Sequence, residues 1–208
     1  MSIPHTKERI LDAAEELMWE KSFHSVGLNE ILKAVGVPKG SFYHYFESKE
    51  HFGVEMLNHY IREATLKKSE MLLNRDTEAD PMKRLITFLE GSIARFSEND
   101  GKCPCLVLKL ASEVTSFSEP MRVVLADGLK TWLDILADVF EEAKVLCMIP
   151  AVIDSNKEAG LMRDLWAGAI QRSTITKSTL PMQNALQCIR ERIASQKASY
   201  NALNRSLA

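Results

Sequence analysis

The chain has 208 residues, a formal net charge of −2 and a hydrophobic fraction of 46%. These values are ordinary for a globular protein, so they argue against an intrinsically disordered chain and against a polycation that binds nucleic acid by charge alone. No apolar stretch approaches the roughly 18 residues of a membrane span, and residues 1–9 lack the apolar core of a signal peptide. We therefore expect a cytoplasmic protein with no membrane partner. The four cysteines do not form a disulfide framework and are expected to be reduced thiols.

Apolar residues recur at helical spacing along the chain, and no stretch shows the strict alternation of a β-strand. The pattern predicts an all-α fold of about nine helices. Caps, prolines and glycines predict where helices begin and end. We expect a helix that ends at Gly36, one that starts after Ser48, one that starts at Asp80-Pro81, one over about 104–115, one that starts after Ser118, one through Trp166 and one over about 180–195. The helices before residue 47 are short and those after it are longer, which predicts two domains, 1–47 and 48–208.

The segment 28–46 has the organisation of a helix-turn-helix unit. A short amphipathic helix ends at Gly36, a tight turn follows, and a second short helix begins near Pro38. Phe42 and Phe46 are four residues apart and are expected to pack inward. The opposite face carries Gly40 and His44, with Ser41 and Tyr43 beside them and Lys39 and Lys49 at the two ends. Such a face is suited to reading bases in the major groove, with phosphate contacts from Tyr43 and the lysines.

The run Pro-Lys-Gly-Ser-Phe-Tyr-His-Tyr-Phe-Glu-Ser-Lys-Glu, residues 38–50, strongly resembles the DNA-binding signature of TetR-family transcriptional repressors. The resemblance implies an N-terminal three-helix domain that binds double-stranded operator DNA, a C-terminal helical domain that binds a small-molecule effector, and a homodimer. The family's usual DNA contacts fall on Asn29, Lys39, Ser41, Tyr43, His44, Tyr45 and Lys49. Tyr45 lies close to the Phe42 side of its helix, so a core role for it stays open.

The charge of the helix-turn-helix segment is unusual for a nucleic-acid-binding unit. Residues 1–52 hold six Lys or Arg side chains against eight Asp or Glu side chains, whereas such units are usually basic. Binding would then depend on a few placed contacts and on helix N-termini. We expect weak non-specific affinity and a shallow dependence on salt.

Two C-terminal segments predict a dimer interface. One carries a cluster of small residues, and the next carries apolar residues in heptad-like order. Two such helices from each protomer would form a four-helix interface, and the resemblance implies the interface at the same place. The predicted interface residues are Gly160, Ala167, Gly168, Met182, Leu186, Ile189 and Ile193. An intramolecular core is the alternative.

Large apolar residues on several C-terminal helices predict an effector pocket, although such residues more often only fill a core. The predicted lining residues are Phe96, Leu106, Leu110, Trp132 and Trp166.

Cys105 is the candidate sensor residue. It follows Cys103-Pro104 and opens a helix, where N-terminal amides stabilise a thiolate. Residues 105–122 and 48–57 resemble a TetR-family repressor that is released from DNA by electrophiles or oxidants, which implies the same for Cys105. The lysine associated with sensing in that repressor aligns with Thr174 here, and Lys177 is nearly a turn away. A buried structural cysteine and a reversible apolar ligand are the alternatives.

Other classes of function have little support in the sequence. All five histidines lie in the first third of the chain, while all four cysteines come later. There is no glycine-rich phosphate loop and no paired His motif, and the two neighbouring cysteines lack further zinc ligands. We therefore expect no enzyme, no catalytic residue, no metal site and no cofactor. A helical adaptor that binds only protein stays open, but it has no use for the ordered run 38–50.

Overall fold

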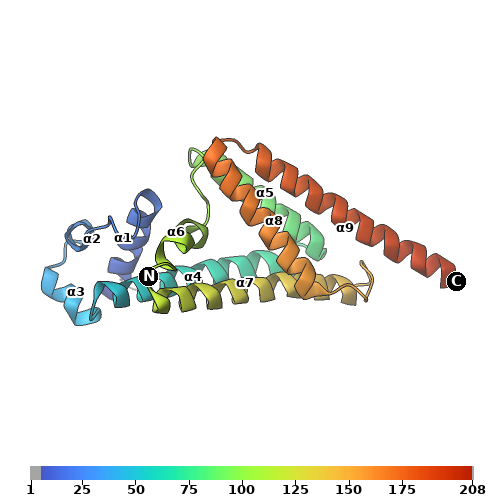
Figure 1. The fold of residues 1–208 in the computed structure, drawn as a ribbon. Coiled ribbons are helices and arrows are strands. Elements are labelled where there is room, and N and C mark those ends of the chain that lie inside the picture. The colour runs from blue at the N-terminus through green and yellow to red at the C-terminus, as the bar shows by residue number, and fades with distance from the viewer. Residues whose placement is uncertain (1–5, 208) are drawn as a thin grey trace. The chain divides into compact units, whose positions relative to one another are not determined.

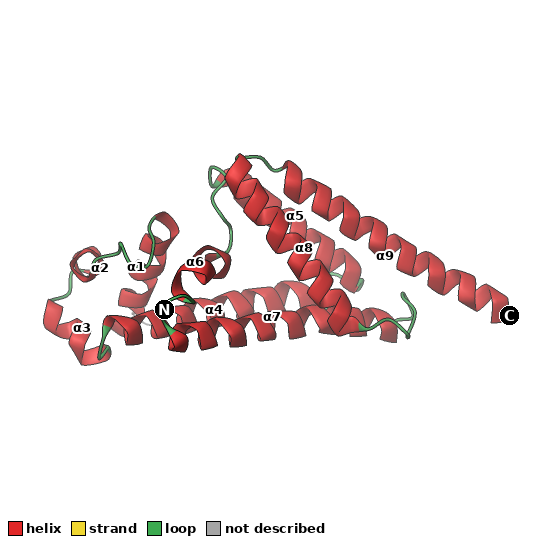
Figure 2. Cartoon of the chain, in the orientation of Figure 1, coloured by secondary structure: helices red, strands yellow, loops and turns green. Residues whose placement is uncertain are grey.

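The computed structural model describes residues 6–207, with side chains up to residue 201. This part of the chain forms nine α-helices and no strand, which confirms the predicted all-α fold (Figures 1 and 2). The helices are α1 (Thr6–Glu20), α2 (Leu28–Val35), α3 (Lys39–Tyr45), α4 (Lys49–Leu73), α5 (Pro81–Glu98), α6 (Leu106–Val114), α7 (Glu119–Val145), α8 (Ser155–Thr176) and α9 (Leu180–Leu207).

Residue contacts divide the chain into two packing units. Unit 1 consists of Met1–Ala64 with Cys105–Leu129, and unit 2 of Thr65–Pro104 with Lys130–Ala208. The packing boundary therefore differs from residue 47, because the first turns of α4 contribute Phe52 to the core of unit 1. The division at residue 47 concerns function, and it stays a prediction.

The core of unit 1 is built around aromatic rings that anchor α3. Phe42, Phe46 and Phe52 are at most 2% exposed. The ring centroids of Phe42 and Phe46 lie 4.9 Å apart, and the Phe52 ring lies 5.3 and 5.1 Å from them. A helix of seven residues is not stable alone in water. The two inward phenylalanines therefore hold α3, and its other face points outward.

The predicted helix ends are confirmed where the sequence carried a capping signal. Gly36 ends α2 in the left-handed conformation with φ of 68°, which favours glycine. The Ser48 hydroxyl accepts a hydrogen bond from the His51 N–H at 3.0 Å at the start of α4. The Asp80 carboxylate accepts from Met82 and Lys83 at the start of α5. Each cap satisfies backbone groups that lack a partner inside the helix.

Unit 2 is formed by long helices, with α9 packed against α8 and α5. The helix that was predicted to end near residue 195 continues to Leu207. The apolar repeat stops at Ile193, and the following residues are mostly polar or small. Periodicity therefore could not detect the last turns.

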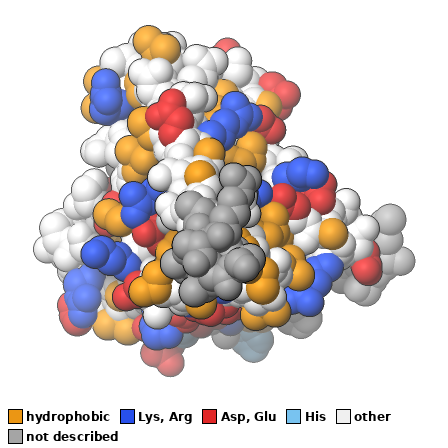
Figure 3. Space-filling view, turned by 90° about the vertical axis from the view of Figure 1, so that its right-hand side faces the viewer, with side chains coloured by type: hydrophobic (Ala, Val, Ile, Leu, Met, Phe, Trp, Pro, Cys, Tyr) orange, Lys and Arg blue, Asp and Glu red, His pale blue; other side chains and the backbone are white. Residues whose placement is uncertain are grey.

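The helices and one face of the surface can be described by their composition. None of the helices within residues 6–207 is long and apolar enough to cross a membrane. On the face of the molecule drawn in Figure 3, Lys and Arg, Asp and Glu, and hydrophobic side chains are interspersed.

Candidate nucleic-acid interface and sensor cysteine

The outward face of α3 carries most of the side chains that were predicted to contact DNA. Lys39, Gly40, Tyr43 and His44 are exposed, and Ser41 is half-buried. Tyr43 is 57% exposed although it is a large aromatic residue. A methyl group added at Gly40 would meet no atom within 4 Å, so packing inside this chain does not require glycine there.

Two further predicted contacts, Asn29 and Tyr45, differ in their surroundings. Asn29 is exposed in the first turn of α2. Tyr45 is half-buried and packs against the core of unit 1, with its ring centroid 4.8 Å from that of His44. Its burial supports the core alternative for the ring.

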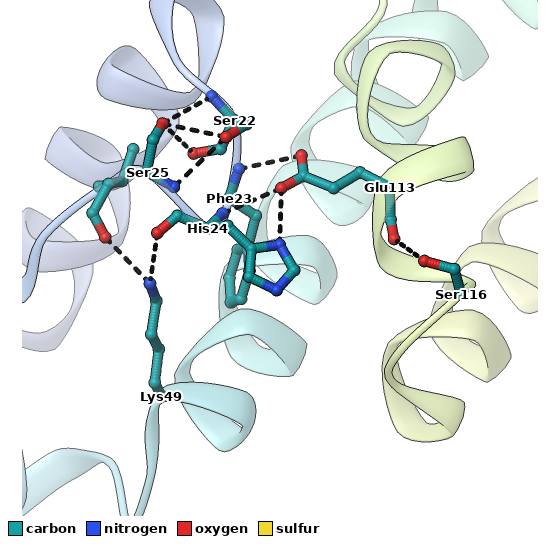
Figure 4. A network of polar contacts seen from close by, with 8 residues as sticks. Ser22, Phe23, His24, Ser25, Lys49, Glu113 and Ser116 are labelled. Carbon is teal, nitrogen blue, oxygen red and sulfur yellow. Dashed lines mark hydrogen bonds and ion pairs between the residues drawn. The ribbon is translucent and has the colours of Figure 1, made fainter.

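The ammonium group of Lys49 contacts the turn between α1 and α2. Its Nζ donates hydrogen bonds to the carbonyl oxygens of His24 at 3.2 Å and Val26 at 3.1 Å, and lies 5.3 Å from the centroid of the Phe23 ring (Figure 4). The sequence predicted a phosphate contact for this residue. In the structure Lys49 holds the turn between α1 and α2, and a phosphate contact stays a prediction.

Two residues that the sequence interpretation did not single out, Lys109 and Glu113, contact the same region from α6. Glu113 accepts hydrogen bonds from the backbone of Phe23 and His24, and Lys109 donates to the last carbonyls of α1. Burial raises the pKa of the Glu113 carboxyl, but hydrogen bonds from the two amides and the His24 ring outweigh it, so the pKa lies below its usual value. The available signal was the spacing of four between Cys105, Lys109 and Glu113.

Cys105 is the N-cap residue of α6, as the sequence predicted. The residue is half-buried, and the N–H of the following Leu106 donates to the Tyr60 hydroxyl at 3.1 Å. Burial raises the pKa of Tyr60, and the nearby Cys105 raises it further. The phenol therefore stays protonated and completes the start of α6 beside the thiol.

In this chain Thr174 stands at the position that aligns with the sensing lysine of the resembling repressor, and Lys177 lies nearby at the end of the same helix. The Thr174 hydroxyl donates to the Ile170 carbonyl within α8 at 2.9 Å. Lys177 ends α8 in the left-handed conformation, and its Nζ donates to the Gly101 carbonyl at 3.1 Å. Both side chains are thus engaged with backbone oxygens.

The five residues of the predicted effector pocket are divided between the units. Leu106 and Leu110 are fully buried in the core of unit 1, whereas Phe96, Trp132 and Trp166 belong to unit 2. Unit 2 has a groove of about 380 Å³ along α5 and α9, and none of the five lines it. A pocket lined by these five residues stays a prediction.

The predicted dimer residues also fall into two groups. The four on α9 are buried within the single chain, between 0% and 7% exposed, and they are Met182, Leu186, Ile189 and Ile193. They pack in the core of unit 2, which is consistent with the intramolecular alternative, and a role in a dimer interface stays a prediction. On α8, Gly160 and Ala167 are half-buried and Gly168 is exposed. A contact with a partner subunit would use α8 and other side chains of α9.

The described side chains include no cluster of three or more His, Cys, Asp or Glu residues that could hold a metal ion.

Comparison with known proteins agrees with this geometry. Residues 10–56 match the sequence family "Bacterial regulatory proteins, tetR family", and residues 81–189 match the family "Tetracyclin repressor-like, C-terminal domain". The chain belongs to the TetR family. The transcriptional repressor NemR of Escherichia coli is 32% identical over 190 residues, which cover 91% of this chain and 94% of NemR. The regulator AcuR of Cereibacter sphaeroides is 31% identical and covers 85% of this chain and 80% of its own length.

Solved structures of TetR-family proteins share the fold. The crystal structure of the reduced form of E. coli NemR aligns with a TM-score of 0.81, and the alignment covers 90% of this chain and 96% of that chain. The structure of a regulatory protein TetR from Rhodobacter sphaeroides aligns with a TM-score of 0.77 at 30% identity, over 88% of this chain and 95% of that chain. These relatives are DNA-binding regulators. This TetR-family chain is accordingly a DNA-binding transcriptional regulator and not an enzyme, and the adaptor alternative is set aside.

Proposed function

We propose that this TetR-family protein is a cytoplasmic repressor that binds an operator as a homodimer and leaves it when an effector acts on the C-terminal part of the chain. The observation that carries the DNA-binding step is the orientation of α3. Phe42 anchors it inward, while Lys39, Tyr43 and His44 point outward. An exposed helix with small and polar side chains can enter a major groove. In a symmetric dimer, two such helices would meet half-sites roughly 34–36 Å apart.

The test of the DNA-binding step separates phosphate contacts from base contacts. We expect Tyr43→Ala to weaken binding to all sequences, because a phosphate contact carries no sequence information. Substitutions at Ser41 or His44 are expected to change base preference. Tyr43 is largely exposed, so its substitution should change the free energy of unfolding by no more than about 0.5 kcal/mol. Unchanged operator binding by all three variants in a titration with labelled DNA contradicts the proposal.

The dimer is proposed to form through α8 and α9. The supporting observation is a stripe on α8 at helical spacing, where Leu161 and Leu165 are exposed next to Gly168. Exposed leucines beside a glycine allow close approach of a second helix. Sedimentation of a Leu165→Lys variant as a monomer is the expected result, and an unchanged dimer contradicts this interface.

For the effector, we propose that Cys105 reacts with electrophiles. The supporting observation is its place as the N-cap residue of α6, since the positive end of a helix dipole favours a thiolate. With an electron-poor alkene such as N-ethylmaleimide, the thiolate sulfur forms a bond to one alkene carbon, and the neighbouring carbon takes a proton from water. The net change is addition of the thiol across the double bond, and no oxidant is needed. The resulting bulk at a half-buried position would displace the start of α6.

The test compares wild type with Cys105→Ser after treatment with N-ethylmaleimide. We expect wild type to lose operator affinity and the serine variant to keep it. Release of both proteins to the same extent contradicts the sensor role.

A reversible apolar ligand is the second candidate effector. Thr174 occupies the position of the sensing lysine in the resembling repressor, and its hydroxyl is bound within its own helix. This observation favours an effector that does not need that lysine. Release from DNA that is reversed by dialysis, and that persists in Cys105→Ser, would support the second candidate.

A further inference from the structure

One carboxylate on α6 holds the turn between α1 and α2. Glu113 accepts hydrogen bonds from the Phe23 N–H at 3.0 Å and from the His24 N–H at 2.9 Å, one on each carboxylate oxygen. The His24 Nδ1 lies 3.1 Å from the same carboxylate. Figure 4 shows the Glu113 side chain reaching from α6 to these backbone amides. The residues in contact are 89 and 90 positions apart in the sequence, so this is a tertiary contact.

A lysine one turn earlier on α6 caps the end of α1. The Lys109 Nζ donates to the carbonyl oxygens of Met18, Trp19 and Lys21 at 2.5, 2.7 and 3.1 Å. The last carbonyls of a helix have no partner within it, and a positive charge is favourable there. The last turn of α1 has no basic residue of its own. Lys109 therefore supplies this charge from another helix.

These contacts lie on one face of α6, and this face begins at Cys105. Cys105, Lys109 and Glu113 are four residues apart, which places them in one row on a helix. A carboxylate in the last turn opposes the dipole of its own helix, so the stability of α6 does not explain Glu113. A second row at the same spacing anchors α6 in the core of unit 1, and its members are Leu106, Leu110 and Val114.

The same turn is held from the other side by α4. While Glu113 binds its amides, Lys49 binds its carbonyl oxygens at His24 and Val26. The turn leads directly into α2, and α2 leads into α3 through Gly36. A movement of α6 would therefore release one side of the turn and leave the other side attached to α4.

We propose that Lys109 and Glu113 are positioning residues for DNA binding. They tie the end of α1 and the α1–α2 turn to α6, and thereby make the placement of α3 depend on the state of the first turn of α6. The inference rests on the proposed function, in which α3 reads the operator and Cys105 is the site of modification. According to this inference, operator affinity also depends on two residues that lie outside the DNA-binding segment.

The test uses the full-length protein with Glu113→Gln and Lys109→Met. Glutamine keeps the size of the side chain, but it offers one acceptor oxygen and turns an N–H toward one of the two amides. Methionine keeps the aliphatic stem of Lys109 and removes the donors. The probe is the duplex that wild type selects from a random-sequence library, and affinity is measured by fluorescence anisotropy in the reduced protein and after N-ethylmaleimide.

The control variants carry the same changes of charge elsewhere. Glu119→Gln on α7 removes an exposed carboxylate that pairs with Arg122, and Lys130→Met removes an exposed ammonium that pairs with Asp134. They report the effect of net charge on DNA affinity. Mass spectrometry of the Cys105 peptide measures alkylation, so that a lost response is not confused with a thiol that fails to react. Thermal unfolding reports whether the fold is intact.

We expect each variant to bind the selected duplex about tenfold more weakly than its control. A change of about tenfold is the size expected when one charge-assisted hydrogen bond is lost. We also expect little further loss when Cys105 is alkylated, whereas both controls are released like wild type. Affinities within about twofold of the controls, with normal release, overturn the proposal. If Glu113→Gln unfolds, Glu113→Asp tests the same contact, because it keeps the charge and shortens the reach, and an intermediate loss is expected.

Failure of the proposed function gives a different result. If alkylated wild type keeps its affinity, Cys105 is not the sensor, and the reduced-state affinities alone decide whether Lys109 and Glu113 position α3. If wild type selects no duplex, the proposed function and this inference are both overturned.

Discussion

The two packing units stabilise their helices in different ways. In unit 1, α2, α3 and α6 have eight, seven and nine residues, and they are held by an aromatic core and by side chains that bind the backbone of turns. In unit 2, α5, α8 and α9 have 18, 22 and 28 residues. These are held by apolar stripes and by ion pairs such as Arg84 with Glu142 and Arg192 with Glu158.

This difference bears directly on regulation. Short helices have little stability of their own, so the placement of α3 depends on contacts made by residues distant in sequence. A few polar contacts, such as those of Glu113 and Lys49, can then be lost without unfolding the core. Unit 1 thus combines an aromatic core with a turn that is held by side chains from two other helices, and this turn is the element that we propose to respond to α6.

The largest effect is expected when the aromatic anchor is removed. Phe46→Ala should lower the free energy of unfolding by about 3–5 kcal/mol, because a fully buried ring leaves a cavity. Phe140 in unit 2 is equally buried, and Phe140→Ala is its matched control. Urea denaturation measures both. We expect similar losses of stability, with operator affinity in dilute urea reduced more by Phe46→Ala; equal reductions would contradict the assignment of the anchor to α3.

The next effect tests the polar core of unit 2. Arg84 is 3% exposed and donates to Glu142 and to the Leu72 carbonyl. Arg84→Met should lower the free energy of unfolding by about 3 kcal/mol, since it leaves a buried carboxylate whose remaining ion pair among the described residues is with the exposed Arg75. The double variant Arg84→Met with Glu142→Leu should recover at least half of the loss in the same assay. A double variant that is less stable than Arg84→Met alone contradicts this explanation.

Two glycines of the helix-turn-helix unit are expected to respond in opposite directions. Gly36→Ala should destabilise by about 1 kcal/mol, because φ of 68° strains any residue with a Cβ. Gly40→Ala should stabilise α3 by about 0.5 kcal/mol, since space is open and alanine favours a helix. The same methyl group would hinder approach to DNA. Unfolding and DNA titrations measured together should show a more stable Gly40→Ala protein that binds less tightly; unimpaired binding would remove Gly40 from the proposed interface.

The smallest effect concerns pH and unit 2. Hydrogen bonds from Arg192 hold the pKa of Glu158 below its usual value of 4.5. The carboxylate therefore stabilises the fold above this pH, and its contribution is lost as the pH falls below it. Because the Arg192 side chain is 49% exposed, the contribution should be only about 0.5 kcal/mol. Denaturation of wild type and Glu158→Gln should differ near neutral pH and converge under acid conditions; a difference that grows in acid contradicts this sign.

Much of the architecture could be predicted from local signals. Apolar spacing predicted the helices, and Gly36, Ser48 and Asp80 predicted where helices end or begin. The spacing of Phe42 and Phe46 predicted which face of α3 is buried. These predictions succeed because a cap or an amphipathic face depends on residues within a few positions of one another.

The sequence did not identify which distant partners cover a helix face or bind a side chain. The apolar row of α9 was predicted to lie in a dimer interface, and the structure shows that Met182 and Ile189 are already buried within one chain. Periodicity predicts that a helix face is buried, but it does not identify whether the same chain or a partner subunit buries it. Likewise, the sequence did not reveal that the Lys49 ammonium binds the turn before α2, and its phosphate contact stays a prediction.

The amino-acid sequence by itself determined the all-α fold, the helix-turn-helix unit and the membership in the TetR family, because these depend on local spacing and on an ordered run of residues. Only the tertiary structure decided which side chains hold the helix-turn-helix unit in place. Lys109 and Glu113 lie about 90 residues from the backbone groups that they bind, and nothing near them in the sequence reveals those partners. Every residue has a backbone carbonyl and every residue except proline has a backbone N–H, so their binding leaves no signature in composition, and folding alone brings the two segments together.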